Sequence, residues 1–309
     1  MKIKANTIDI EVDISGPRTD AQGRALPVVL LIMGLGMQLT AWPPALVQAL
    51  VDAGFCVVRF DNRDAGLSQR QDQHGRPNLI WASVKYRFGW TIRPLYSLLD
   101  MAADALGVLD ALNIESAHVV GVSMGGMIAQ RLALIAPART LSLTSIMSTS
   151  SARGLPAARP DVARALLSRP RGPTEQDAVE HMVRLLKIIG SPGFASNDSV
   201  LREQVTAANR RSYHPAGTAR QIVAVVADSA RAEDLHRITA PTLVIHGRSD
   251  PLVPFACGQD TARRIPGSQL VGIDGMGHDL SPGVVTHILA ALIPHLSHPP
   301  TSPTPHQLP

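Results

Sequence analysis

Two hydrophobic patterns alternate along the chain: short continuous apolar runs and apolar residues at helical spacing. Short apolar runs at 27–33 (PVVLLIM) and 55–60 (FCVVRF) are typical of strands covered on both faces. Residues 41–54 between them have the length and spacing of a helix, and apolar residues at helical spacing over 98–112 lead into another strand at 117–121. This order predicts the α/β class, with a mostly parallel sheet and helices on both faces.

Other elements of this pattern lie before and after these units. Alternating residues at 7–14 predict a half-buried strand, and residues 127–137 predict a helix. Three further apolar runs predict strands at 141–147, 241–247 and 269–274.

The interval between the predicted strands at 141–147 and 241–247 contains only helical patterns and helix breakers. Within it, Thr174 and Asp177 form a capping-box pattern, and Gly190 stands where that helix should end. We predict that residues 150–235 form a helical cap inserted over the carboxyl edge of the sheet.

The domain boundaries follow from this insertion. Residues 1–149 and 236–296 are predicted to form the core. Residues 297–309 contain five prolines and no apolar period, so we predict a disordered tail.

Composition narrows the classes of function. The net charge of +4 over 309 residues, without basic runs interleaved with aromatics, argues against nucleic-acid binding. No run approaches the ~20 apolar residues that span a bilayer, and the first residues lack a signal-peptide pattern. Cys56 and Cys257 are too few for a disulfide framework or zinc cluster. We expect a cytoplasmic protein without a membrane partner, cofactor or metal; the sequence leaves its oligomeric state open.

The joint between the strand at 117–121 and the next helix places a serine among glycines. Residues 121–126 read GVSMGG, a G-x-S-x-G pattern at a strand-to-helix turn. Such a turn exposes the Ser123 hydroxyl above the sheet edge, where a base and a substrate can reach it. A glycine-rich helix start packed closely on the sheet is the simpler alternative, but it does not explain the serine.

A serine hydroxyl needs a base to remove its proton and a carboxylate to orient that base. Asp250 follows the strand at 241–247 and His278 follows the strand at 269–274, which gives the order Ser, Asp, His. Asp250 could instead cap a helix beginning at Pro251. Asp274 and Asp279 are competing acids, but they flank the histidine too closely in sequence to orient it easily.

Attack on a carbonyl also requires donors for the oxyanion that forms. The Met124 amide, next to the serine, is one candidate. Gly34 and Gly36 allow the backbone to turn in after the strand at 27–33, and we assign the second donor to the Leu35 amide.

These motifs resemble the α/β-hydrolase superfamily. The segments on which this resemblance rests are GVSMGG (121–126), FDNRDAGLS (60–68), LLDMAADALGVLDAL (98–112), ITAPTLVIHGRSDPLVP (238–254) and GMGHDL (275–280). Within that superfamily, the combination of MGLG, WP and RFDNRDAGLS is most similar to the aclacinomycin methylesterase branch of bacterial carboxylesterases.

The resemblance implies an α/β-hydrolase fold with a mostly parallel eight-stranded sheet, and hydrolysis of carboxylic esters of small molecules through an acyl-enzyme. Ser123, Asp250 and His278 match the family triad, and Leu35 and Met124 match its oxyanion amides. Asp61 and Arg63 match a structural turn. Many relatives have His-Gly before the oxyanion loop, whereas this chain has Met33-Gly34.

Several other functions fit parts of the pattern. A lactonase, a carbon–carbon bond hydrolase or a proline iminopeptidase would use the same triad, although iminopeptidases usually carry tryptophan where this chain has Met124. A ligand receptor could share the fold. An NAD-dependent oxidoreductase would explain GLGMQL, but Leu39 stands where its third small residue belongs. Arg202, Arg210 and Arg211 could bind an anionic substrate group or simply be solvated.

Overall fold

The protein is described by a computed structural model that covers residues 1–88 and 90–297. The predicted disordered tail lies outside these residues, apart from Ser297, which ends the last helix.

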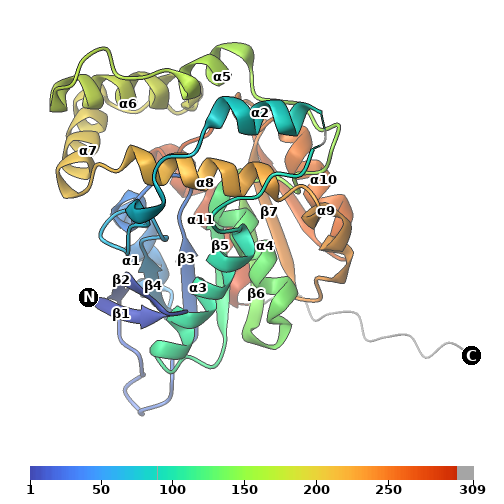
Figure 1. Ribbon diagram of the computed structural model, residues 1–309. Helices are drawn as coiled ribbons and strands as arrows, with labels where there is room; N and C mark the ends of the chain where they lie inside the picture. The colour runs from blue at the N-terminus through green and yellow to red at the C-terminus, as the bar shows by residue number, and fades with distance from the viewer. Residues whose placement is uncertain (89, 298–309) are drawn as a thin grey trace, which may run out of the picture.

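Eight strands form one sheet (Figure 1). They are β1 (Lys2–Ala5), β2 (Ile8–Ser15), β3 (Val28–Ile32), β4 (Cys56–Phe60), β5 (Ala117–Val122), β6 (Thr140–Ile146), β7 (Thr242–Gly247) and β8 (Gln269–Ile273). Their order is β1-β2-β4-β3-β5-β6-β7-β8, with β1–β2 and β2–β4 antiparallel and all other pairs parallel. The predicted mostly parallel eight-stranded sheet is confirmed.

Helices connect and cover these strands. They are α1 (Pro44–Asp52), α2 (Leu79–Arg87), α3 (Leu98–Ala111), α4 (Met124–Ile135), α5 (Pro160–Leu167), α6 (Glu175–Ile189), α7 (Asp198–Arg211), α8 (Pro215–Ala227), α9 (Arg231–Asp234), α10 (Phe255–Arg264) and α11 (Pro282–Ser297). Short 3-10 turns occur at Leu39–Ala41, Asp72–His74, Pro137–Arg139 and Leu235–Arg237.

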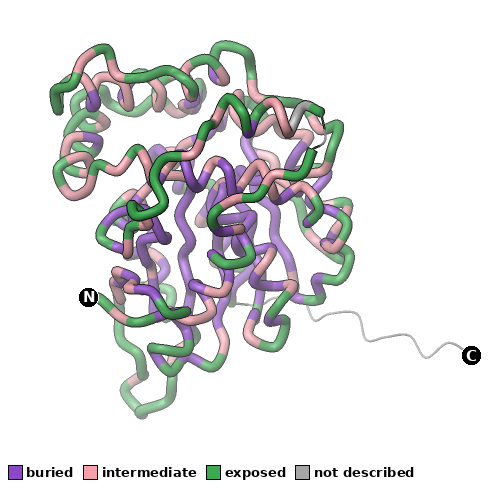
Figure 2. The backbone as a smooth tube through the Cα atoms, viewed as in Figure 1, coloured by how far each residue is buried: buried purple, intermediate pink, exposed green. Residues whose placement is uncertain are grey.

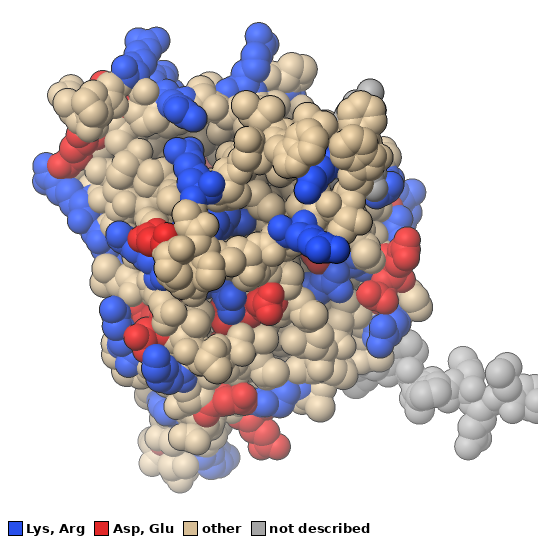
Figure 3. Space-filling model, viewed as in Figure 1, with Lys and Arg blue, Asp and Glu red and all other residues tan. Residues whose placement is uncertain are grey.

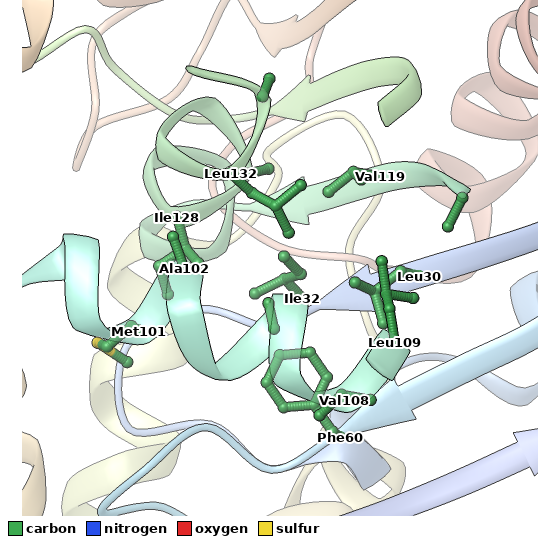
Figure 4. Close-up of a cluster of buried hydrophobic side chains, with 14 of the residues drawn as sticks. Leu30, Ile32, Phe60, Met101, Ala102, Val108, Leu109, Val119, Ile128 and Leu132 are labelled. Carbon is green, nitrogen blue, oxygen red and sulfur yellow. The ribbon is translucent and has the colours of Figure 1, made fainter. Parts of the chain in front are cut away.

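The central strands are buried on both faces, which explains their unbroken apolar runs. In β3, Leu30 and Ile32 pack with α3 and α4 on one face, where Figure 4 shows Leu30 beside Leu109. The intervening Val29 and Leu31 pack with α1 and α11 on the other face. Figure 2 shows the resulting layers, with buried strands inside a more exposed shell of helices and loops. Two cores, one on each side of the sheet, therefore fix its position.

The segment between β6 and β7 holds α5 to α9. Thr174 and Asp177 form the predicted capping box of α6, and its C-cap is Gly190, so these predictions are confirmed. Figure 1 shows α5, α6 and α7 grouped beyond α8, which runs across the top of the sheet. Ala224 of α8 and Leu235 are buried in the core beside α3 and α4. The division into a core and a cap at residue 235 stays a prediction.

His118 in β5 makes the stability of the fold depend on pH. Its ring is buried against Phe55, and burial, aided by the nearby charge of His295, lowers its pKa to about 4 from an ordinary 6.5. Between these values the unfolded chain binds the extra proton, so stability falls as the pH is lowered through this window. The loss is at most about 3 kcal/mol, at about 1.4 kcal/mol for each pH unit.

Urea unfolding at pH 7 and pH 5 measures this effect. We expect the free energy of unfolding to fall less between these conditions in His118→Asn than in the original chain, because asparagine does not titrate but can still bond Ser142. Equal losses in the two proteins would show that His118 does not contribute.

Candidate active site

Ser123 occupies a strained turn between β5 and α4. Its φ is +56° and its ψ −120°, a backbone conformation that is uncommon for a residue with a side chain. The turn is anchored because the Ser123 amide donates to the Ile146 carbonyl at 2.9 Å, and the Ser123 carbonyl accepts from the Gly126 amide at 2.9 Å. Strain of this kind is typical of functional sites, where the surrounding structure holds it.

The glycines around Ser123 leave no room for side chains. A Cβ at Gly121 would lie 2.1 Å from the Gly125 carbonyl oxygen, and one at Gly125 would lie 2.0 Å from the Ile32 carbonyl oxygen. At Gly126 a Cβ would come within 2.6 Å of the Ser148 Cβ. The turn can therefore pack against β3 and β6 only because these three positions lack bulk.

Gly125→Ala is expected to destabilise the protein by about 1–3 kcal/mol, because the new methyl group meets rigid backbone. Thermal unfolding measures the change. Gly54→Ala is the control: Gly54 has a φ of +89° but nothing within 4 Å of an added Cβ, so it reports backbone strain without a clash. A loss at position 125 no larger than at position 54 would contradict this explanation.

The side chains of Ser123, His278 and Asp250, which follow three separate strand ends, lie together. His278, after β8, places Nε2 at 3.0 Å from the Ser123 Oγ. Its Nδ1 lies 2.7 Å from Oδ2 of Asp250, which follows β7. The other oxygen, Oδ1, accepts from the Leu252 amide at 2.9 Å and the Val253 amide at 2.8 Å. These distances form a hydrogen-bonded chain from carboxylate through imidazole to hydroxyl. Asp250 and His278 are both buried.

The alternative role of Asp250 as a helix cap and the two competing acids, Asp274 and Asp279, do not match the geometry. The next helix, α10, begins at Phe255, so Asp250 caps a turn rather than a helix starting at Pro251. Asp279 instead accepts from the Ser191 amide and hydroxyl, at 2.8 and 2.7 Å. Asp274 is exposed and pairs with Arg248. Of the three acids, Asp250 is the one bonded to the His278 ring.

Residues distant in sequence hold the histidine loop and the acid turn. The His278 amide donates to the Ile189 carbonyl at 2.7 Å, and the Gly277 amide donates to Ser191 Oγ at 2.8 Å. His246 lies behind Asp250, with Nε2 2.7 Å from the Val253 carbonyl and burial lowering its pKa. Sequence reasoning missed these contacts because no local pattern links the end of α6 to the loop after β8.

The turn after β3 lies beside Ser123. A Cβ added at Gly34 would be 3.3 Å from the Ser123 Cβ. The Gly36 amide already donates to Gln221 Oε1 at 2.8 Å, and the Met37 amide donates to the Gly34 carbonyl at 3.2 Å. Within the described part of the chain, no acceptor is found for the amides of Leu35 and Met124. Both predicted donors thus lie on backbone that borders Ser123.

The turn after β4 makes structural contacts. Asp61 accepts from the Leu39 amide at 2.7 Å and the Leu67 amide at 2.8 Å, and Arg63 forms a two-pronged ion pair with Asp104 at 2.5 and 2.6 Å. These contacts agree with the scaffold role that the resemblance implied.

The three arginines considered for anion binding have acidic partners. Arg202 pairs with Glu180, and Arg210 with Glu175, on the surface. Arg211 is more buried, and its guanidinium lies 2.8 Å from Asp61. Figure 3 shows Lys and Arg interspersed with Asp and Glu over this face of the molecule, without one continuous patch of a single sign.

Among residues 1–88 and 90–297, no group of three or more His, Cys, Asp or Glu is placed to hold a metal ion. Across the same residues, every helix is too short or too polar to cross a bilayer.

Comparison with solved structures places this chain among proteins of the same fold. A meta-cleavage product hydrolase from Pseudomonas fluorescens IP01 superimposes with a TM-score of 0.74 at 20% identity, covering 96% of this chain and 97% of that one. An enol-lactonase from Burkholderia xenovorans LB400 gives a TM-score of 0.66 at 21% identity, covering 94% and 95%. At such identities the likeness concerns the fold.

Sequence comparison finds nearer relatives. Rhodomycin D methylesterase DauP of Streptomyces sp. (strain C5) is 32% identical over 287 residues, and rhodomycin D methylesterase DnrP of Streptomyces peucetius is 31% identical. Each match covers 86% of this chain and 90% of the relative. A family model described as the alpha/beta hydrolase fold matches residues 27–282. The predicted resemblance is confirmed, and this chain belongs to the alpha/beta hydrolase fold family.

Proposed function

We propose that this protein is a serine hydrolase that cleaves carboxylic esters of small molecules through an acyl-enzyme intermediate. The observation that carries the proposal is the chain from Asp250 Oδ2 through His278 to Ser123 Oγ, with separations of 2.7 and 3.0 Å. The similarity to two methylesterases supports esters as the substrate class.

In the acylation half of the reaction, His278 Nε2 takes the Ser123 proton while Oγ attacks the ester carbonyl carbon. The negative charge that forms on the carbonyl oxygen is held by the Leu35 and Met124 amides. His278 then gives its proton to the alkoxy oxygen as the carbon–oxygen bond breaks, and the alcohol leaves. Asp250 keeps the imidazole oriented and stabilises its charged form.

In the deacylation half, a water molecule replaces the alcohol. His278 removes a proton from this water as it attacks the acyl carbon, and then returns the proton to Ser123 Oγ as the ester bond to the enzyme breaks. A carboxylic acid leaves and the serine is restored, so the cycle consumes one ester and one water.

Methyl esters of bulky acids are the finer proposal, and it rests on the similarity to two rhodomycin D methylesterases. A lactonase, a carbon–carbon bond hydrolase or an iminopeptidase would use the same three side chains. The cytoplasmic location also stays a prediction, based on a sequence with two cysteines and no apolar run long enough to span a bilayer.

Product analysis over a set of esters tests the substrate class. We expect p-nitrophenyl esters of short acids to be hydrolysed with an initial burst of about one p-nitrophenol per enzyme if deacylation is slow. Methyl esters of bulky acids should release methanol. Turnover of lactones, vinylogous diketones or proline amides without turnover of any open-chain ester would overturn the ester assignment.

A further inference from the structure

Gln221 of α8 joins two loops next to the proposed site. Its side chain is fully buried, and both polar atoms of its amide are used. Oε1 accepts from the Gly36 amide at 2.8 Å, and Nε2 donates to the Arg63 carbonyl at 2.8 Å. One side chain therefore ties the turn after β3 to the turn after β4.

The turn at Gly34–Met37 has little support from bonds within itself. Gly36 has a φ of +66°, in the region open to glycine, and the one bond within the turn is the 3.2 Å contact from the Met37 amide to the Gly34 carbonyl. The Leu35 N–H belongs to the Gly34–Leu35 peptide unit, and the Gly36 N–H belongs to the adjoining Leu35–Gly36 unit, so a change in the backbone torsions of Leu35 would turn one amide relative to the other. The bond from Gly36 to Gln221 holds the Leu35–Gly36 unit in place and so restricts the backbone next to the Leu35 amide, and it commits the Gly36 amide to Gln221.

Other parts of α7 and α8 reinforce the same turn. The Thr218 side chain packs on Gly36, since a Cβ there would lie 2.7 Å from Thr218 Oγ1. Gln38 Nε2 donates to the Ala208 and Ser212 carbonyls at 2.7 and 3.0 Å, and Gln38 Oε1 accepts from Arg211 at 2.6 Å. The segment between β6 and β7 thus contacts the loop at Gly36 and at Gln38, and Gln221 is the residue of that segment that binds the Gly36 amide.

We propose that Gln221 is a positioning residue for ester hydrolysis: it fixes the turn at Gly34–Met37 so that the Leu35 amide is aimed at the developing oxyanion. Gln221 does not touch the reacting atoms and acts through Gly36. This inference rests on the proposed function. Because the oxyanion forms only as the carbonyl is attacked, loss of Gln221 should weaken the transition state more than the bound substrate.

Gln221→Met tests the assignment, because methionine keeps a similar length and removes both hydrogen bonds. Deleting an oxyanion donor costs about 10²–10³ in kcat, and a misaimed donor should cost less, about 10–100-fold, with KM within about threefold. The inhibition constant of a trifluoromethyl ketone, which forms an oxyanion on Ser123, should rise by a similar factor. Gln221→Asn, which is shorter by one methylene, should shift kcat in the same direction if the methionine variant does not fold.

Gln130→Met is the matched control. Gln130 is also a fully buried glutamine, but its hydrogen-bond partners are Ser145 and Arg231 rather than the turn at Gly34–Met37. We expect it to lower the melting temperature and leave kcat and the inhibitor constant within about twofold. Unchanged kcat in folded Gln221→Met or Gln221→Asn, or an equal loss in Gln130→Met, would overturn the positioning role. A chain with its original sequence that hydrolyses no ester would instead be a failure of the proposed function.

Discussion

Ser123→Ala is expected to lower kcat for ester hydrolysis by about 10⁶-fold, the loss seen when a serine nucleophile is removed from such a triad. Without Oγ no acyl-enzyme can form, and the His278 Nε2 that lies 3.0 Å from that oxygen loses its partner. Binding and the oxyanion amides would still leave slow hydrolysis above the rate in water. The measurement is the rate of p-nitrophenol release from a short-chain ester, with the original and variant chains purified alike.

Ser116→Ala is the control for this variant, since Ser116 stands just before β5, at the opposite end of the strand from Ser123. Its activity should match that of the original chain. Ester turnover in Ser123→Ala above about one hundredth of the original rate would mean that another group is the nucleophile.

Asp250→Asn is expected to lower kcat by about 10⁴-fold while the fold is kept. The amide oxygen can still accept from the Leu252 and Val253 amides, so the turn after β7 should survive. The amide nitrogen, however, would donate to His278 Nδ1, which leaves the proton on Nε2 and removes the base that faces Ser123. The effect should appear in kcat with little change in melting temperature.

Asp274→Asn is the matched control, because Asp274 lies near His278 in sequence but is exposed and pairs with Arg248. Its kcat should stay within about twofold of the original, as for surface substitutions in general. If the two variants lose similar activity, or if Asp250→Asn keeps most of it, Asp250 does not orient the histidine.

Much of the sheet could be predicted because its strands carry their environment in their sequence. The run VVLLI of β3 is apolar at every position, and each position packs into one of the two cores. In contrast, β1 was missed because Lys2–Ala5 is short, lies at the edge of the sheet and has lysine at two of its four positions. The amphipathic pattern of α2 is weak, since it leaves Ile80 and Trp81 exposed, and it was not predicted.

Some residues of the proposed site could likewise be predicted from the sequence and others could not. Ser123, Asp250 and His278 could be named because each follows a strand end in a short recognisable motif, and strand ends of a parallel sheet meet at one edge. Gln221, Ser191 and His246 could not be named. Gln221 binds Gly36, which lies 185 residues away in the chain, and Ser191 binds Gly277, which lies 86 residues away. His246 is bonded to the backbone carbonyl of Val253, a group that any residue could supply. Such contacts depend on how α6 and α8 are packed, which no local pattern encodes.

Covalent labelling by an organophosphonate tests the activated serine most directly. The reagent reacts with a serine whose proton is taken by a neighbouring base, and intact-mass and peptide measurements locate the adduct. We expect one adduct per chain on Ser123, strongly slowed labelling in Asp250→Asn and none in Ser123→Ala. An unlabelled original chain, or an adduct that persists at another residue in Ser123→Ala, would contradict it.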